Sequence, residues 1–170
     1  MKKRFLQDMA LSNTQSSSFQ HANVYADNIS LDRRKSFVQE FRHKLEGLEK
    51  IYGQTVSSEQ HPKNIEGFAD SLTNSFPDVL YEKKMRIGIA QKAVNLYLKY
   101  MWCFGWIPEP PHCPIDRTVL EAVDDQDDWT KMDGIRNYSE KIRKIELKKG
   151  DKSFSEWECE LFNNRANEEN

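Results

Sequence analysis

The sequence has no long apolar run, few cysteines and almost no net charge. No stretch approaches the roughly 20 apolar residues that a membrane-spanning helix needs, and the basic start at residues 2–4 is not followed by the apolar segment of a signal peptide. The three cysteines cannot all pair, so we expect reduced thiols in a cytoplasmic protein. A formal net charge of -2 gives no overall attraction to a polyanion. We therefore expect a cytoplasmic protein with no membrane partner.

The 170 residues are enough for one domain with a real core. Charged residues make up 31% of the chain and aromatic residues 11%, which is typical of a soluble, charged protein with an aromatic centre. Residues 1–29 are rich in Ser, Gln and Asn, and we expect a poorly ordered polar arm there, with at most a short helix. We expect a single helical domain over residues 30–166 and a flexible acidic tail over 167–170.

Apolar residues recur at intervals of three and four along most of the chain, which predicts helices. The pattern over residues 89–104 is the widest apolar stripe and predicts the central helix. No segment is typical of a strand, and no internal repeat is found. The expected fold is all-α, a compact bundle of about six helices with a hairpin-helix and a proline-rich turn. The predicted helices span residues 30–52, 61–76, 89–104, 116–123, 133–149 and 153–165.

Charge is unevenly distributed along the chain. Residues 82–100 contain five basic residues and one acidic residue, and residues 131–149 contain seven basic and three acidic residues. Four aspartates lie between them, within residues 124–128. Two basic helices are able to form one positive face for phosphates. The alternative is that both are ordinary solvated helix faces, which single charge runs usually are.

Two residues in the segment 86–123 are candidates for chemistry. Lys92 lies early in the predicted central helix, and Asp116 follows four prolines and opens the next helix. A lysine and a carboxylate brought together can perform amine or acid–base chemistry. Gly88 precedes the lysine in a Gly-apolar-small sequence, which suits a turn that presents backbone N–H groups to a phosphate. The alternatives are a plain helix start with an exposed lysine, and an aspartate that only caps its helix.

Together these segments resemble the helix-hairpin-helix DNA glycosylase superfamily, which includes endonuclease III-like and 8-oxoguanine glycosylase-like enzymes. The resemblance covers about 38 residues, from Arg86 to Val123. Residues 88–90 match the hairpin, with alanine at its second glycine. Lys92 matches the nucleophile, and Ile115-Asp116 matches the segment that carries the family's aspartate.

The resemblance implies cleavage of the N-glycosidic bond of a modified base that is flipped out of double-stranded DNA. Lys92, as the neutral amine, would attack C1′ and form a Schiff base, and Asp116 would stabilise positive charge on the sugar or activate the nucleophile. Substrate contacts are expected from Gly88, Ala90, Asn95, Trp102, Trp106 and Arg117. Phosphate contacts are expected from Lys83, Lys84 and Arg86.

No cofactor and no metal are expected. Cys103, His112, Cys113 and Cys159 are residue types that bind zinc, but His112 and Cys113 are adjacent and no CxxC pair exists. Buried cysteines are the more ordinary explanation. The aromatic residues between 97 and 106 are expected to be mostly core, with Trp106 the best candidate for a ring that faces a ligand.

Two classes of function therefore stay open. The first is a DNA-acting enzyme that resembles a base-excision glycosylase, with or without lyase activity. The second is a non-enzymatic helical module that binds a protein partner or nucleic acid. An exposed apolar patch, with Lys92 on an ordinary surface, would favour the second class.

Overall fold

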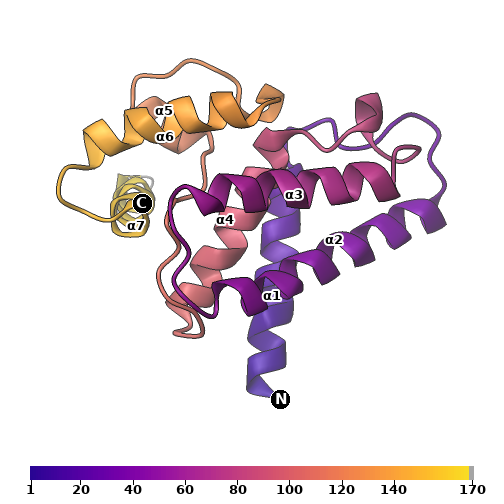
Figure 1. Cartoon of the computed structure of the whole chain (residues 1–170), viewed down its shortest axis with the longest axis horizontal. Helices are drawn as coiled ribbons and strands as arrows, with labels where there is room; N and C mark the ends of the chain where they lie inside the picture. Colours follow the sequence, from indigo (N-terminus) through magenta and orange to yellow (C-terminus); the bar gives the residue numbers. More distant parts are fainter. Residues whose placement is uncertain (169–170) are drawn as a thin grey trace.

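The computed structural model describes the backbone of residues 1–168 and the side chains of residues 1–165. Within this part of the chain the protein is all-helical, with an isolated bridge between Tyr25 and Leu80 in place of any sheet (Figure 1). The predicted fold class is confirmed. The α-helices are α1 (Lys2–Phe19), α2 (Leu31–Tyr52), α3 (Gln60–Ser75), α4 (Ile87–Cys103), α5 (Arg117–Ala122), α6 (Ile135–Lys149) and α7 (Phe154–Glu168), and the 3-10 turns are η1 (Tyr81–Lys83) and η2 (Trp129–Lys131).

Helix α4 is the centre of the bundle, as its apolar stripe predicts. It packs against α1, α2, α3 and α6, and η2 covers its first turn. Its neighbours surround it so fully that 11 of its 17 residues are buried. Most of the buried positions are apolar, as the core of a bundle requires, and the buried polar residues Gln91 and Asn95 have hydrogen-bond partners.

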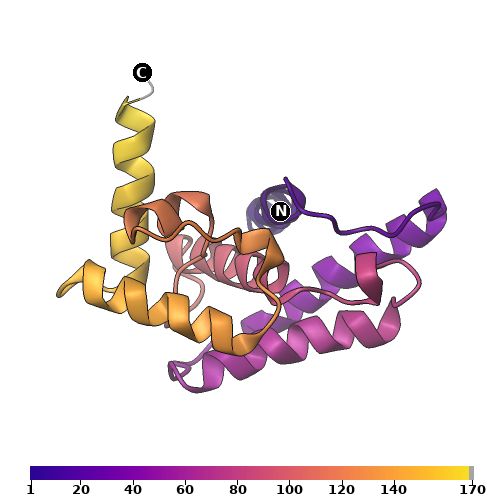
Figure 2. The same ribbon diagram turned by 90° about the horizontal axis from the view of Figure 1, so that it is seen from above.

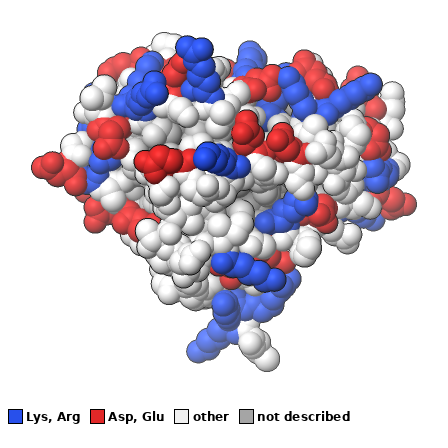
Figure 3. All heavy atoms as spheres, viewed as in Figure 1, with Lys and Arg blue, Asp and Glu red and all other residues white. Residues whose placement is uncertain are grey.

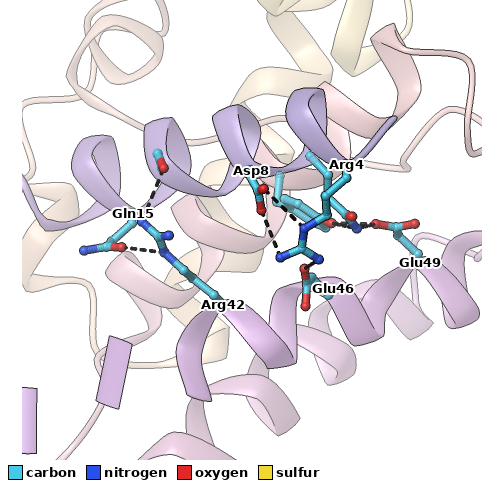
Figure 4. Close-up of polar contacts among 9 residues, drawn as sticks. Arg4, Asp8, Gln15, Arg42, Glu46 and Glu49 are labelled. Carbon is cyan, nitrogen blue, oxygen red and sulfur yellow. Dashed lines mark hydrogen bonds and ion pairs between the residues drawn. The ribbon is translucent and has the colours of Figure 1, made fainter. Parts of the chain in front are cut away.

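The expectation of a poorly ordered arm over residues 1–29 is wrong. Residues 2–19 form helix α1, which lies along α4 and buries Ala10 and Leu11 in the shared core. A row of polar contacts joins the outer side of α1 to α2 (Figure 4). In this row Arg4 pairs with both Asp8 and Glu46. The small polar residues of α1 permit close packing on α4, and composition alone does not show this.

Two of the predicted helix starts are confirmed by their caps. The Ser30 hydroxyl accepts a hydrogen bond from the N–H of Arg33 at 3.3 Å and starts α2. Ser153 and Glu156 form a reciprocal capping box at the start of α7, with bonds of 3.2 and 3.1 Å. Gly105, with a φ of 72°, ends α4 in a left-handed conformation that glycine adopts without strain.

The C-terminal half forms a second group of helices around one end of α4. Helix α6 runs beside α3 and α4, and α7 extends away from the rest of the bundle (Figure 2). The acidic segment after α5 is tied to α6, since the buried Asp125 accepts hydrogen bonds from Lys141 and Lys144 at 2.6 and 2.7 Å. The pKa of Asp125 is well below its usual range, because these bonds outweigh the effect of burial.

Two further expectations concern the C-terminal tail and membrane-spanning helices. Of the expected tail 167–170, the first two residues belong to α7, and the last two lie outside the described residues. Among the described helices, none is both long enough and apolar enough to cross a bilayer.

Candidate functional site

Lys92 and Asp116 lie side by side because the residues that precede them, Gln91 and Ile115, are hydrogen-bonded to each other. Gln91 of α4 donates from Nε2 to the carbonyl oxygen of Ile115 at 2.6 Å and accepts from the Ile115 N–H at 3.0 Å. This pair of bonds holds the extended chain before α5 against α4. Asp116 therefore lies beside Lys92, with 3.6 Å between Oδ2 and Nζ.

The Asp116 carboxylate has two roles that use different oxygens. Its Oδ1 accepts from the N–H of Val119 at 3.2 Å and caps α5, as predicted. Its Oδ2 faces Lys92 and remains partly exposed, with 32% of the side chain accessible. The capping role alone explains the aspartate at a helix start, but it does not explain why the second oxygen faces a lysine.

The Lys92 amine is largely buried beside an aromatic ring and a carboxylate, both of which favour its charged form. Only 12% of its side chain is exposed, and Nζ lies 4.3 Å from the centroid of the Trp129 ring. Burial lowers the pKa of Lys92, and the opposing effect of Asp116 does not outweigh it. A lysine with a lowered pKa is a better nucleophile near neutral pH than an exposed one.

A second charged pair lies two helical turns along α4. Lys99 binds Glu158 of α7 in an ion pair whose side chains are 15% and 11% exposed. Burial lowers the pKa of Lys99, but the charge and hydrogen bond of Glu158 oppose it, and the net shift is upward. The pKa of Glu158 is raised, because its burial outweighs the attraction of Lys99.

The two pairs line one pocket between α1, α4 and α7. It has a volume of about 420 Å³, and Lys92, Lys99, Asp116 and Glu158 all contribute to its wall. A neighbouring pocket of about 370 Å³ shares Asp116 and Glu158 and extends towards Arg165. Pockets of this size accommodate small organic molecules.

The sequence analysis did not identify Lys99 or Glu158. Lys99 lies seven residues after Lys92, a spacing that places both lysines on the same face of a helix. This spacing could have identified Lys99 from the sequence. Nothing around Glu158 in the sequence indicates that α7 brings it to α4.

The expected hairpin at residues 88–90 does not form. These residues are the first turn of α4, and all three are buried. The Gly88 N–H donates to the Met132 carbonyl at 2.8 Å, and the Ala90 N–H donates to the Arg86 carbonyl at 3.0 Å. These two backbone donors therefore have partners within the protein, and neither presents itself to a phosphate.

The expected phosphate-binding cations are dispersed. Lys84 pairs with Asp133, and Arg86 pairs with Glu82 at 2.5 Å and lies over the Tyr81 ring. Lys83 is exposed on η1. On the face shown in Figure 3, positive and negative side chains are interspersed over most of the surface. Local ion pairs thus neutralise much of the basic segment 82–100.

The remaining expected substrate contacts do not gather at the pocket. Trp102 and Trp106 are half-buried, and Trp106 packs on Phe104 and beneath Lys3. Arg117 is exposed and pairs with Glu121 on its own helix. None of these three lines the pocket that holds Lys92.

Asn95 belongs to a buried polar network that the sequence analysis did not foresee. Its Oδ1 accepts from His61 Nε2 at 2.7 Å, and its Nδ2 donates to the Tyr138 hydroxyl at 3.2 Å. The Tyr138 hydroxyl is in turn hydrogen-bonded to His112 Nδ1 at 2.9 Å, and the Tyr52 hydroxyl donates to His61 Nδ1 at 2.5 Å. Burial lowers the pKa of His61 to about 4 and that of His112 to about 3. The network joins α2, α3, α4 and α6 and leaves no access for a substrate.

The cysteines are dispersed as well. Cys113 is buried, and burial raises the pKa of its thiol well above the usual range. Cys103 is exposed, and Cys159 is half-buried at the pocket wall. In the part of the chain that the structure describes, no three His, Cys, Asp or Glu side chains are arranged to hold a metal ion.

Comparison of the chain with protein-family models, with curated proteins and with solved structures finds no match.

Proposed function

We propose that the pocket of Lys92 and Asp116 is the active site of an enzyme that cleaves the N-glycosidic bond of a modified nucleotide in DNA. The observation that carries this proposal is the distance of 3.6 Å between a largely buried lysine amine and a partly exposed carboxylate at the wall of a pocket of about 420 Å³. The resemblance of residues 86–123 to helix-hairpin-helix glycosylases assigns the same two residues.

The chemistry requires a neutral amine, an electrophilic carbon and a leaving base. Burial prepares the Lys92 amine by lowering its pKa, and Asp116 is placed to take the proton that the ammonium releases. The amine forms a bond to C1′ of the deoxyribose while the bond from C1′ to the base breaks. The bonding pair leaves with the base, which takes up a proton. The C1′–O4′ bond then breaks and O4′ keeps the bonding pair, so the sugar ring opens and an imine joins C1′ to Nζ of Lys92. The nitrogen loses two protons in all, which balance those taken up by the base and by O4′.

DNA must be held differently from the way the resemblance implies. The first turn of α4 is covered by η2, and the charges of Lys84 and Arg86 are paired. Among the described residues, exposed basic side chains near the pocket include Arg117, which opens α5, and Arg165, which lines the neighbouring pocket. Because Lys84 and Arg86 are paired, a nucleotide in single-stranded or locally unpaired DNA fits better than a long duplex contact.

Borohydride trapping tests the proposal. The probes are one oligonucleotide with an abasic site and a set with modified bases, each as a single strand and as a duplex. We expect wild-type protein to form a covalent adduct. Lys92→Met should be trapped at least about a hundredfold more slowly, because the imine forms on this amine. Lys35→Met is the matched control, because it removes a lysine of α2 whose side chain is 74% exposed and which does not line the pocket.

Asp116→Asn separates the charge from the helix cap. Asparagine caps a helix as well as aspartate does, so α5 should be retained. The proposal predicts a slower reaction with unchanged folding, measured by circular dichroism and trapping. Equal trapping by wild-type protein and Lys92→Met, on every probe, would reject the enzyme and leave a non-enzymatic helical module as the better hypothesis.

A further inference from the structure

A groove between α2 and α3 lies apart from the Lys92 pocket. It has a volume of about 520 Å³, and Leu48 and Phe68 contribute apolar side chains to its lining. Both are almost fully buried, whereas Ile51 at the same groove is 44% exposed. The two helices diverge towards the loop 53–59 that joins them (Figure 1).

Each wall of the groove has a glycine in the interior of its helix. Gly47 lies in α2 and Gly67 in α3, and both line the groove. A Cβ at either position would have no heavy atom within 4 Å, so the packing of this chain does not require glycine there. Glycine weakens a helix interior relative to alanine. Its presence on both walls keeps the groove open and lets another backbone approach closely.

The rim of the groove is basic. Lys50 of α2 and Lys63 of α3 are exposed, and neither has an ion-pair partner among the described residues. Lys44 pairs with Glu40 at 3.0 Å, and His43 faces the same carboxylate at 3.8 Å. Glu40 is the only acidic side chain among the described residues that line the groove, so the rim attracts negative charge from both sides.

An occupant must therefore combine an apolar stripe with acidic flanks. An amphipathic helix has this pattern, because its apolar residues recur on one face and its charged residues lie beside them. Helices of this kind bind in grooves between two helices, where apolar anchors supply affinity and charges supply orientation.

We propose that the groove between α2 and α3 is a docking site for an acidic amphipathic helix of a partner protein. The apolar face of that helix packs mainly on Ile51, with the small exposed edges of Leu48 and Phe68 beneath it, and its backbone approaches Gly47 and Gly67. Its carboxylates face Lys50 and Lys63. This site is independent of the proposed enzymatic activity.

Two synthetic peptides test the proposal by fluorescence anisotropy with the full chain. The first is a labelled helix of about five turns, with leucine on one face and glutamate on both flanks, and the second has lysine in place of each glutamate. We expect the acidic peptide to bind at least tenfold more tightly than its basic twin. Equal binding of the two peptides, or no binding of the acidic one at millimolar concentration, would overturn the proposal.

Two variants locate the site. Lys50→Glu with Lys63→Glu should reverse the preference between the peptides, whereas Lys83→Glu, a matched exposed charge on η1, should leave it unchanged. Gly47→Leu with Gly67→Leu fills the groove and should weaken binding of the acidic peptide at least tenfold. Circular dichroism should show that the helical fold of this variant is intact. Retained binding in the leucine variant would place the peptide elsewhere. Sedimentation that shows a dimer disrupted by these leucines would instead assign the groove to a second copy of the chain.

Discussion

Among the seven glycines, Gly88 is the position at which an added Cβ should disturb the packing most. A Cβ at Gly88 would lie 1.8 Å from the carbonyl oxygen of Trp129 and 3.2 Å from Cβ of Met132. An ordinary contact between carbon and a carbonyl oxygen is about 3.3 Å or longer. The turn η2 must then retreat from α4, although the Gly88 N–H donates to the Met132 carbonyl at 2.8 Å and holds it there.

We expect Gly88→Ala to lower the free energy of unfolding by about 2–4 kcal/mol. Overpacking costs about 1–3 kcal/mol, and a weakened backbone hydrogen bond costs about 1 kcal/mol more. Partial exposure of Trp129 and Met132 adds roughly 1 kcal/mol, and the better helix propensity of alanine offsets about the same amount. In thermal unfolding this corresponds to a melting temperature lower by about 5–15 °C.

The same substitution at the two groove glycines is the control. Because a Cβ at Gly47 or Gly67 meets nothing within 4 Å, alanine should raise the free energy of unfolding by about 0.5–1 kcal/mol at each. Urea unfolding followed by far-ultraviolet circular dichroism measures all three variants. A Gly88→Ala protein as stable as the wild type would refute the close packing of η2 on α4.

Three other predictions concern buried polar groups and a cap. Because burial lowers the pKa of His61 to about 4 and of His112 to about 3, the unfolded chain binds protons below about pH 6.5 while the folded protein does not. The free energy of unfolding should therefore be greatest above pH 6.5 and should fall by about 2 kcal/mol per histidine from pH 7 to pH 5, as measured by urea unfolding. If His112→Gln left this dependence of stability on pH unchanged, the prediction would be contradicted. Asp125→Asn should lower the free energy of unfolding by about 2–4 kcal/mol, because it leaves the buried Lys141 poorly paired, whereas Asp127→Asn, at a carboxylate that is 72% exposed, should change it by less than about 1 kcal/mol. Ser30→Ala should cost about 1 kcal/mol in the same assay through the lost cap of α2, and an unchanged midpoint would show that the cap contributes nothing.

Most of the helices were predictable because their signals are local. Ser30, Asp116 and the pair Ser153/Glu156 cap helices at the residues where the sequence places them. The apolar spacing over residues 89–104 identified the central helix to within two residues at its start. Caps and apolar periodicity act over three to seven residues, a distance that the sequence displays directly.

The errors share a physical cause, which is that composition and motif do not specify neighbours. Residues 2–19 are polar enough to suggest disorder, but α4 offers a complementary surface on which α1 packs. Gly88 has a place in the expected hairpin motif, but the turn η2 that fills the space beside it comes from more than 40 residues later. Local sequence cannot encode a contact whose other half folds from a distant segment.

The sequence by itself determined the all-α class, most helix boundaries and the candidate pair Lys92 and Asp116, because helix periodicity, capping and residue chemistry are local properties. Only the tertiary structure decided that these two side chains lie 3.6 Å apart, that Lys99 and Glu158 join them at one pocket, and that Asn95 lies in the core. Burial lowers the pKa of Lys92, and burial is a property of the assembled bundle. The pKa of that amine therefore depends on the packing of η2 against α4 and on the position of Asp116 beside it.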